Sequence, residues 1–183
     1  MAVNLQKGQR ISLDKESGTS LQTVAMGLGW DVGSGPNIDL DASCIMFDEN
    51  KQMIDAVWFR QLRSKDGSVS HSGDNVTGAG DGDDEVITVT LKGVPALVKS
   101  MVFTVNSFTG QKFSRVQNSY CRLINRADNA EIARFSLAER GDHTAMIMAR
   151  LYRHNDEWKM HAIGQPTDGE TFAKLIPTII QFL

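Results

Sequence analysis

The sequence predicts an all-β fold, an antiparallel β-sandwich with a few short helices. Segments rich in β-branched and aromatic residues recur about every 8–15 residues, with turn-forming residues between them. Several segments alternate apolar and polar residues, which is the pattern of a strand buried on one face. Helical periodicity is confined to short stretches. A chain of 183 residues is long enough to bury a sizeable core.

The first half of the chain is expected to form strands joined by turns. Residues 5–13 are expected as a strand interrupted by a turn at Gly8. Residues 21–30 are expected as a strand that ends near Gly29 in a bulge or a close backbone approach. The other elements expected here are a hairpin over 38–59 with strands at 38–47 and 56–62, a polar connection at 64–73 and a strand at 86–91.

The second half is expected to continue with antiparallel pairs. The expected elements are one helical turn at 94–98, a strand at 100–108, a short helix at 111–118, and hairpins formed by 119–125 with 131–137 and by 144–152 with 157–163. The pattern changes after Gly164, so we assign residues 1–165 to the sandwich and 166–183 to a C-terminal tail. Residues 171–183 are apolar enough for a short docking helix, which Pro177 would limit to a few turns.

Charge is distributed unevenly along the chain. The net charge is −3, but residues 1–91 hold 7 Lys and Arg against 14 Asp and Glu, whereas residues 92–183 hold 12 against 8. The acidic half argues against nucleic acid as a ligand, because phosphate binding needs a basic face. The start has no secretory signal and no apolar run is long enough to span a membrane, so a cytoplasmic protein without a transmembrane segment is expected.

The two cysteines, Cys44 and Cys121, both lie in apolar segments. Buried free thiols are the expected state, and a disulfide stays open as an alternative. Because no pair of histidines lies near them in the sequence, they make a poor zinc site.

The most unusual stretch is 73–85, GDNVTGAGDGDDE. It holds five carboxylates and four glycines, and no Lys or Arg occurs between residues 66 and 91. Such a stretch is either a solvated loop or the site of a cation that supplies the missing positive charge. Oxygen ligands of this kind suit Ca²⁺ first and Mg²⁺ second. The spacing does not match an EF-hand.

A second pair of carboxylates is expected on the strand at 38–47. Asp39 and Asp41 fall on one face of this strand, about 7 Å apart, since each residue rises about 3.3 Å. Both side chains can therefore reach one cation or a closely spaced pair of cations. The alternative is a solvent-facing strand edge, although Asp is a poor strand former.

No motif in the chain indicates catalysis. There is no G-x-S-x-G, H-E-x-x-H, P-loop or C-x-x-C sequence. His71 is expected to be a solvated or hydrogen-bonded loop residue. The alternative to a binding protein is a metal-dependent hydrolase in which the ion of the acidic loop acts as a Lewis acid and His71 is the local base.

Five segments carry distinctive motifs. They are GLGWD at 27–31, IDLDASC at 38–44, HSGDNVTGAGDGDDE at 71–85, FTVNSF at 103–108 and LYRHNDEW at 151–158. Together and in this order they resemble the TerD family of bacterial tellurium-resistance and stress proteins. VWFR at 57–60 and GQKFSRVQNSYCR at 110–122 are most similar to the TerZ branch. The resemblance covers residues 2–165.

The resemblance implies a β-sandwich that binds one or two Ca²⁺ ions through loops at one end. The family's acidic motif carries over onto Asp31, Asp39, Asp41, Asp74, Asn75, Asp81, Asp83, Asp84 and Glu85. Backbone carbonyls at Gly80 and Gly82 are expected to complete the coordination. Ala79 stands where many relatives carry an acidic residue, so one outer negative charge is missing.

The resemblance also implies a non-enzymatic protein linked to tellurite resistance and to phage, colicin or oxidative stress. We therefore expect a Ca²⁺-dependent structural or interaction module. Other Ter-type stress proteins and a peripheral membrane surface are its candidate partners. Whether the ion acts as a switch or as a permanent structural element stays open at this stage.

Overall fold

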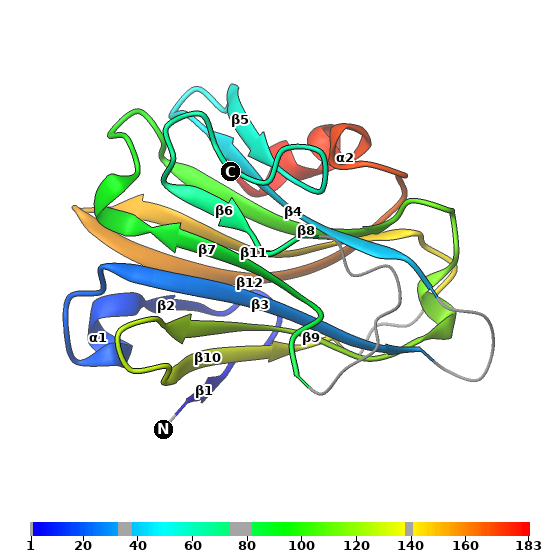
Figure 1. The fold of residues 1–183 in the computed structure, drawn as a ribbon, viewed down its shortest axis with the longest axis horizontal. Helices are drawn as coiled ribbons and strands as arrows, with labels where there is room; N and C mark the ends of the chain where they lie inside the picture. Colours follow the sequence, from blue (N-terminus) through cyan, green and yellow to red (C-terminus); the bar gives the residue numbers. More distant parts are fainter. Residues whose placement is uncertain (1, 33–37, 74–81, 138–140) are drawn as a thin grey trace.

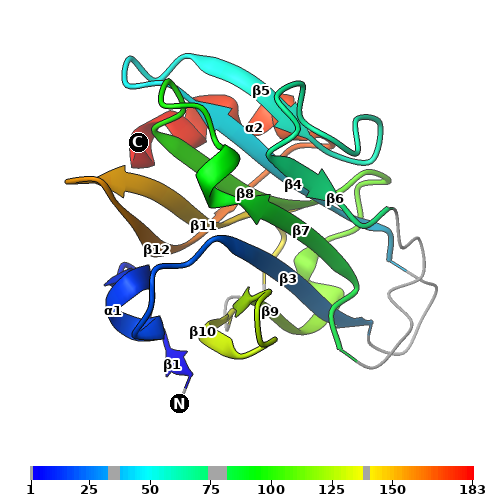
Figure 2. The ribbon, with the colours of Figure 1, turned by 60° about the vertical axis from the view of Figure 1, so that its left-hand side comes forward.

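The computed structural model describes residues 2–32, 38–73, 82–137 and 141–183. Two six-stranded sheets pack face to face, which confirms the predicted β-sandwich (Figures 1 and 2). The strand pairs are antiparallel except for the short pair β1 and β10, which is parallel.

The strands of the two sheets interleave along the chain. The first sheet consists, in spatial order, of β1 (Val3–Asn4), β10 (Glu131–Ser136), β9 (Val116–Asn125), β3 (Thr23–Val32), β7 (Glu85–Thr90) and β6 (Val69–His71). The second sheet consists of β2 (Arg10–Ser12), β12 (Glu157–Thr167), β11 (Ala145–His154), β8 (Ser100–Ser107), β4 (Leu40–Phe47) and β5 (Met53–Val57). Both predicted hairpins of the second half are present, as β9–β10 and β11–β12.

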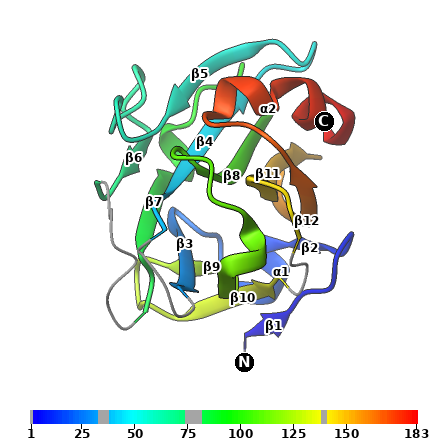
Figure 3. The same cartoon turned by 90° about the vertical axis from the view of Figure 1, so that its right-hand side faces the viewer.

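The core forms by alternation along the strands. In β7, residues 85, 87 and 89 are buried and the residues between them are half-buried. Every residue of β4 and β8 is buried, because the second sheet is covered on both faces. The first sheet packs on one face of the second sheet, and the helix α2 (Phe172–Ile179) packs on the other face of the second sheet (Figure 3).

The C-terminal helix expected within residues 171–183 is present as α2, followed by the 3₁₀ helix η3 (Ile180–Phe182). The helix α2 continues two residues past Pro177. Leu175 and Ile179 are fully buried against the second sheet, so the helix docks on the protein's own sandwich. Within the described residues, no helix is long and apolar enough to span a membrane.

The strand predicted at 21–30 differs from β3 at its end. The predicted bulge is confirmed, because the register against β9 shifts between Gly29 and Asp31. The predicted end at Gly29 is wrong, since β3 continues to Val32 and pairs with β9 as far as Val116. The bulge therefore redirects the strand instead of ending it.

Several short elements differ from the expectation. β6 lies in the stretch expected as a polar connection, and the helix α1 (Leu13–Ser17) begins at the last residue of the expected strand. The return strand β5 starts and ends earlier than expected. Each of these elements is three to five residues long, which is too short for sequence periodicity to reveal.

Of the two helices predicted in the middle of the chain, the one at 94–98 is absent and the one at 111–118 is shorter than expected. Residues 94–98 form no helix; the turn there is closed by the Val98 N–H, which donates to the Pro95 carbonyl at 2.9 Å. A 3₁₀ helix, η1 (Leu91–Gly93), lies just before it. Within 111–118 only the 3₁₀ helix η2 (Phe113–Arg115) forms, because β9 begins at Val116.

Candidate functional site

The described candidate ligands lie near one end of the sandwich, where β3 ends and β4 and β7 begin (Figure 1). These residues are Asp31, Asp39, Asp41, Gly82, Asp83, Asp84 and Glu85. The remaining candidates, Asp74, Asn75, Gly80 and Asp81, lie outside the described residues.

Asp83 lies flat on the outer face of the first sheet, over a glycine of β3. A Cβ atom added to Gly27 would sit 2.1 Å from Asp83 Oδ2, and one added to Gly29 would sit 2.4 Å from the ring of Tyr120. The two glycines of the GLGWD motif are two residues apart and therefore face the same side of the strand. Their missing side chains make room for Asp83 and Tyr120.

Arg122 of β9 supplies the counter-charge that the acidic stretch itself lacks. Its Nε and Nη2 donate to the two oxygens of Asp83 at 2.8 and 3.0 Å. The hydroxyl of Tyr120 donates to Asp83 Oδ1 at 3.0 Å and to the Gly82 carbonyl at 2.8 Å. Burial and the neighbouring Asp83 raise the pKa of Tyr120 to about 12, so the hydroxyl keeps its proton.

A second layer of ion pairs holds Arg122 in place. Its Nη1 lies 3.2 Å from Glu131 Oε2, and Arg134 donates to both oxygens of Glu131 at 2.8 and 2.9 Å. The guanidinium of Arg134 lies 4.4 Å from the centre of the Tyr120 ring. Hydrogen bonds from Arg134 and then from Arg122 lower the pKa of Glu131. We call the set Gly82, Asp83, Tyr120, Arg122, Glu131 and Arg134 the outer-face latch.

Asp84 is the residue around which the described carboxylates gather. Its N–H donates to the Leu28 carbonyl at 2.8 Å, and its Oδ2 accepts from the Trp30 N–H at 2.8 Å. Burial raises the pKa of Asp84, the bond from Trp30 opposes this, and the charges of Asp31, Glu85 and Asp83 raise it further. The ionised form of Asp84 is therefore held in a field that favours a nearby cation.

Asp31 lies beside this group on the surface. It follows the bulge of β3, is exposed, and accepts a hydrogen bond from Asn118 Nδ2 at 2.7 Å. Asn118 has a φ of 50°, a backbone conformation that Asn tolerates better than most residues. The contact fixes the orientation of Asp31 and leaves its charge uncompensated by Asn118.

Glu85 points into the sandwich. Its side chain is fully buried, and its Oε2 accepts from the Ala42 N–H at 2.6 Å and lies 3.2 Å from His71 Nε2. The same Nε2 lies 3.1 Å from the Ala42 carbonyl, and His71 Nδ1 accepts from the Gly73 N–H at 3.0 Å. In a neutral ring the proton is therefore on Nε2. His71 is thus hydrogen-bonded, one of the two predicted alternatives, but it is buried at the end of β6, so its predicted place in a loop is wrong.

Glu85 and His71 take the place of a missing strand. β5 pairs with β4 only from Cys44 to Phe47, so the edge of β4 at Ala42 lacks that neighbour. The two side chains bond both backbone groups of Ala42 instead. A buried backbone group needs such a partner, and this contact joins the two sheets.

Asp41 does not lie with Glu85. Ala42 packs into the sandwich interior, and alternation along β4 places Asp41 on the opposite face, which α2 covers. Asp41 is buried, at 4% exposure, and pairs in register with Asn106. Asp39 precedes β4 and is half-buried. The structure thus brings together Asp31, Asp83, Asp84 and Glu85, and separates Asp41 from Glu85.

Both cysteines are free and buried, as expected. Burial raises the pKa of Cys121 to about 12, and burial together with Asp55 raises the pKa of Cys44. Thiols in this state are poor nucleophiles and poor metal ligands.

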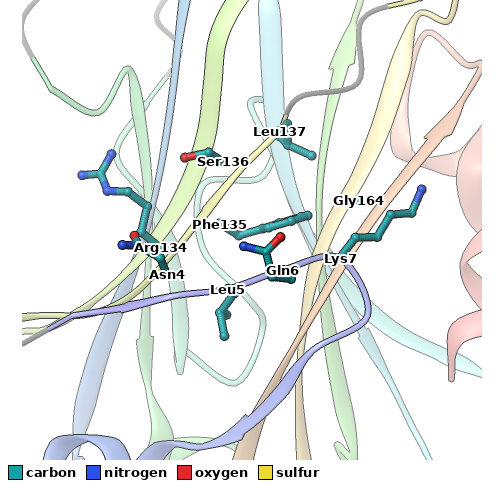
Figure 4. A pocket seen from close by; sticks show the side chains of 9 residues that line it. All are labelled: Asn4, Leu5, Gln6, Lys7, Arg134, Phe135, Ser136, Leu137 and Gly164. Carbon is teal, nitrogen blue, oxygen red and sulfur yellow. The ribbon is translucent and has the colours of Figure 1, made fainter.

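A groove of about 350 Å³ lies elsewhere, between the N-terminal segment, β10 and β12 (Figure 4). The side chains of Lys7 and Arg134 point in different directions from it, and Arg134 is bound to Glu131. Phe135 lies across Gly164 at its floor. The groove gathers no set of converging polar groups and is not a candidate catalytic site.

The TerD domain family profile matches residues 1–178. The chain belongs to the TerD family. The match includes most of α2, beyond the segment that the sequence motifs covered. Tellurium resistance protein TerZ of Serratia marcescens is 43% identical to this chain, over 97% of each protein. General stress protein 16U of Bacillus subtilis is 40% identical, over 92% of this chain and 93% of that protein.

A solved structure supports the same fold. The crystal structure of a homologue of the telluride resistance protein TerD from Streptomyces coelicolor matches with a TM-score of 0.73. It covers 86% of this chain and 96% of that chain, at 20% sequence identity. At 20% identity this match supports the fold alone.

Proposed function

We propose that this TerD-family protein is a non-enzymatic stress-response protein associated with tellurium resistance that works as a Ca²⁺-dependent structural or interaction module. The names of its relatives support the stress-response role, since they include a tellurium resistance protein and a general stress protein. Other Ter-type stress proteins are the first candidate partners. The candidate Ca²⁺ site is the end of the sandwich around Asp84.

One observation carries the Ca²⁺ proposal, namely the group of carboxylates around Asp84. Burial and the charges of Asp31, Glu85 and Asp83 raise the pKa of Asp84, so a cation beside Asp84 would stabilise its ionised form. The donors are all oxygens, which fits Ca²⁺. Among the described residues, no group of three or more His, Cys, Asp or Glu is arranged to hold a metal alone. The site would therefore need Asp74, Asn75, Gly80 and Asp81 as well.

The described residues differ in the roles they would have. Asp31 and Asp84 would hold the ion, because the charge of the exposed Asp31 helps to raise the pKa of Asp84, and a cation between them would oppose that effect. Asp83 is neutralised by Arg122 and would position the loop, and Glu85 would anchor it to β4. A bound Ca²⁺ supplies positive charge that relieves the repulsion among the carboxylates. Asp39 and Asp41 remain predicted ligands.

Thermal unfolding of chelator-treated protein during a Ca²⁺ titration tests the proposal, with about millimolar Mg²⁺ as competitor. A ligand specific for the folded state stabilises it by about 2.7 kcal/mol at a hundredfold excess over its dissociation constant. For a chain of this size the midpoint should rise by about 5–10 °C. The double variant Asp81→Asn with Asp84→Asn should lose this shift.

The matched control is Glu49→Gln, which removes an exposed carboxylate from the β4–β5 turn. It should respond to Ca²⁺ like the wild type. No shift, or an equal shift with Mg²⁺ that survives in the double variant, would indicate that the acidic stretch is a solvated loop.

The geometry does not favour the alternative of a metal-dependent hydrolase. His71 was the local candidate base, but both of its ring nitrogens are engaged by Ala42, Glu85 and Gly73. A general base needs a free acceptor within reach of substrate. The buried position of His71, at 8% exposure, offers no such access.

A further inference from the structure

Two arginines and one histidine form a row across the second sheet. In the strand register, Arg10 of β2 lies opposite His161 of β12, and His161 lies opposite Arg150 of β11. Side chains directly opposite each other share a face and have Cβ atoms about 4.5–5.5 Å apart. The next residue of the row, Val102, packs under α2. In Figure 3, β12 and β2 lie below α2 and the C-terminus.

The two arginines of this row have no carboxylate partner in the described part of the chain. Arg150 donates to Ser100 Oγ at 2.8 and 3.0 Å and to the Phe182 carbonyl at 2.8 Å, and its guanidinium lies 4.6 Å from the Tyr152 ring centre. Arg10 is exposed. Burial and the charge of Arg10 lower the pKa of Arg150, while Tyr152 opposes the change.

His161, between the two arginines, is 6% exposed, and among the described residues no hydrogen-bond partner reaches its buried Nδ1. Burial, Arg10 and Arg150 lower the pKa of His161 to about 4. On the same face, Lys159 adds another positive charge, and the nearby carboxylate of Glu157 accepts a hydrogen bond from Ser12. A buried polar nitrogen without a partner is uncommon in folded proteins and calls for an explanation.

We propose that Arg10, His161 and Arg150 form a binding site for a small oxyanion, of the phosphate, sulfate or tellurite class. An oxyanion offers only acceptor oxygens, which match the donors of guanidinium groups. Arg150 is already fixed by Ser100 and Phe182, and the exposed Arg10 is free to close over the anion. A bound anion would relieve the repulsion along the row. None of these residues belongs to the candidate Ca²⁺ site.

Thermal unfolding with low-millimolar sodium phosphate, sulfate or tellurite tests this site, at constant ionic strength and with a chelator present. At a hundredfold excess over the dissociation constant, the wild-type midpoint should rise by about 5 °C. Arg10→Gln should lose most of that shift. Arg63→Gln, which removes an exposed arginine from the isolated β-bridge to Ser70, should keep it. Equal shifts in all three proteins would indicate general stabilisation by salt and would overturn the proposal.

Titration of the His161 imidazole by NMR gives an independent readout. Phosphate should raise the His161 pKa from its lowered value in the wild type and in Arg63→Gln, and by much less in Arg10→Gln. An unchanged His161 titration would contradict the site. Binding of a phosphoserine peptide more tightly than of inorganic phosphate would identify the ligand as a group on a larger molecule, whereas the reverse order would identify a free oxyanion.

Discussion

At the scale of single residues, the central feature is the ion pair between Asp83 and Arg122. The acidic stretch has no Lys or Arg near it in the sequence, yet Arg122, nearly forty residues further along the chain, places its Nε 2.8 Å from Asp83 Oδ1. The spacing of Gly27 and Gly29 matches that of Arg122 and Tyr120, their partners in register on β9. That matched spacing is the one signal in the sequence that could have revealed the latch.

Replacement of Gly27 by alanine should destabilise the protein. The new Cβ would meet Asp83 Oδ2 at 2.1 Å, and Asp83 cannot move freely because Arg122 and Tyr120 hold it. We expect a loss of about 1–3 kcal/mol, as for other overpacked sites. This outweighs the gain of about 0.4–1 kcal/mol that a Gly→Ala change brings at an unstrained position. Denaturant unfolding measures the difference.

Gly93→Ala is the matched control for this change. A Cβ there would find its nearest neighbour at 3.6 Å, an ordinary contact distance. Gly93→Ala should therefore be neutral or slightly stabilising. If Gly27→Ala unfolds at the same denaturant concentration as Gly93→Ala, Asp83 is not held by the latch.

At the scale of elements, the sequence predicted the long strands, placed the short strands β2 and β5 with other bounds and missed β6. β4, β7, β8 and the two later hairpins were expected because a segment of six or more residues holds enough alternating, β-branched or aromatic residues to identify a strand. β6 has three residues and no such signal. Without β6, His71 appeared to lie in a loop, and its contact with Glu85 and Ala42 could not be foreseen. Long-range partners of this kind depend on topology, which sequence periodicity does not encode.

The contact at the edge of β4 gives a prediction for Glu85. Glu85→Ala should destabilise the fold by about 1–3 kcal/mol relative to Glu85→Gln, because it leaves the buried Ala42 N–H without its acceptor. The glutamine retains a carbonyl oxygen at that position. Both variants remove the charge, so their difference contains the lost hydrogen bond and the lost packing of a buried side chain, and exchange at the Ala42 amide reports the hydrogen bond. Chemical unfolding and hydrogen exchange at the Ala42 amide measure the two effects.

The amide of Ala42 should exchange faster in Glu85→Ala than in Glu85→Gln, whereas the amides of β8 should change only with global stability. Equal exchange at Ala42 in the two variants would show that another group satisfies this amide. That result would contradict the interpretation that Glu85 substitutes for a strand partner at the edge of β4.

At the scale of the whole molecule, the two proposed sites lie on different strands. Asp31, Asp83, Asp84 and Glu85 lie where β3 ends and β7 begins, in the first sheet, whereas Arg10, His161 and Arg150 lie on the neighbouring strands β2, β12 and β11 at one edge of the second sheet. The sequence showed the charge asymmetry along the chain. It could not show that residues as distant as 10, 150 and 161 would be neighbours, because only the sheet order places them together.

The charge around Asp84 predicts that Asp84→Asn stabilises the protein without metal and destabilises it, relative to the wild type, in saturating Ca²⁺. Because its pKa is raised in the folded state, the folded protein binds this proton more tightly than the unfolded chain does. The stabilisation linked to this proton is complete below the ordinary value of 3.8 and is lost as the pH rises through the raised value. At neutral pH without metal, ionised Asp84 therefore opposes folding.

Asp84→Asn should accordingly unfold at a higher temperature than the wild type in chelator at pH 7, since asparagine is neutral and its oxygen can still accept from Trp30. This advantage should shrink as the pH falls toward 4. In saturating Ca²⁺ the order should reverse, because the wild type keeps the ligand charge that the variant has lost. If the variant is less stable in chelator and still responds fully to Ca²⁺, Asp84 is a structural acceptor for β3, and the ion, if bound, is held by other residues.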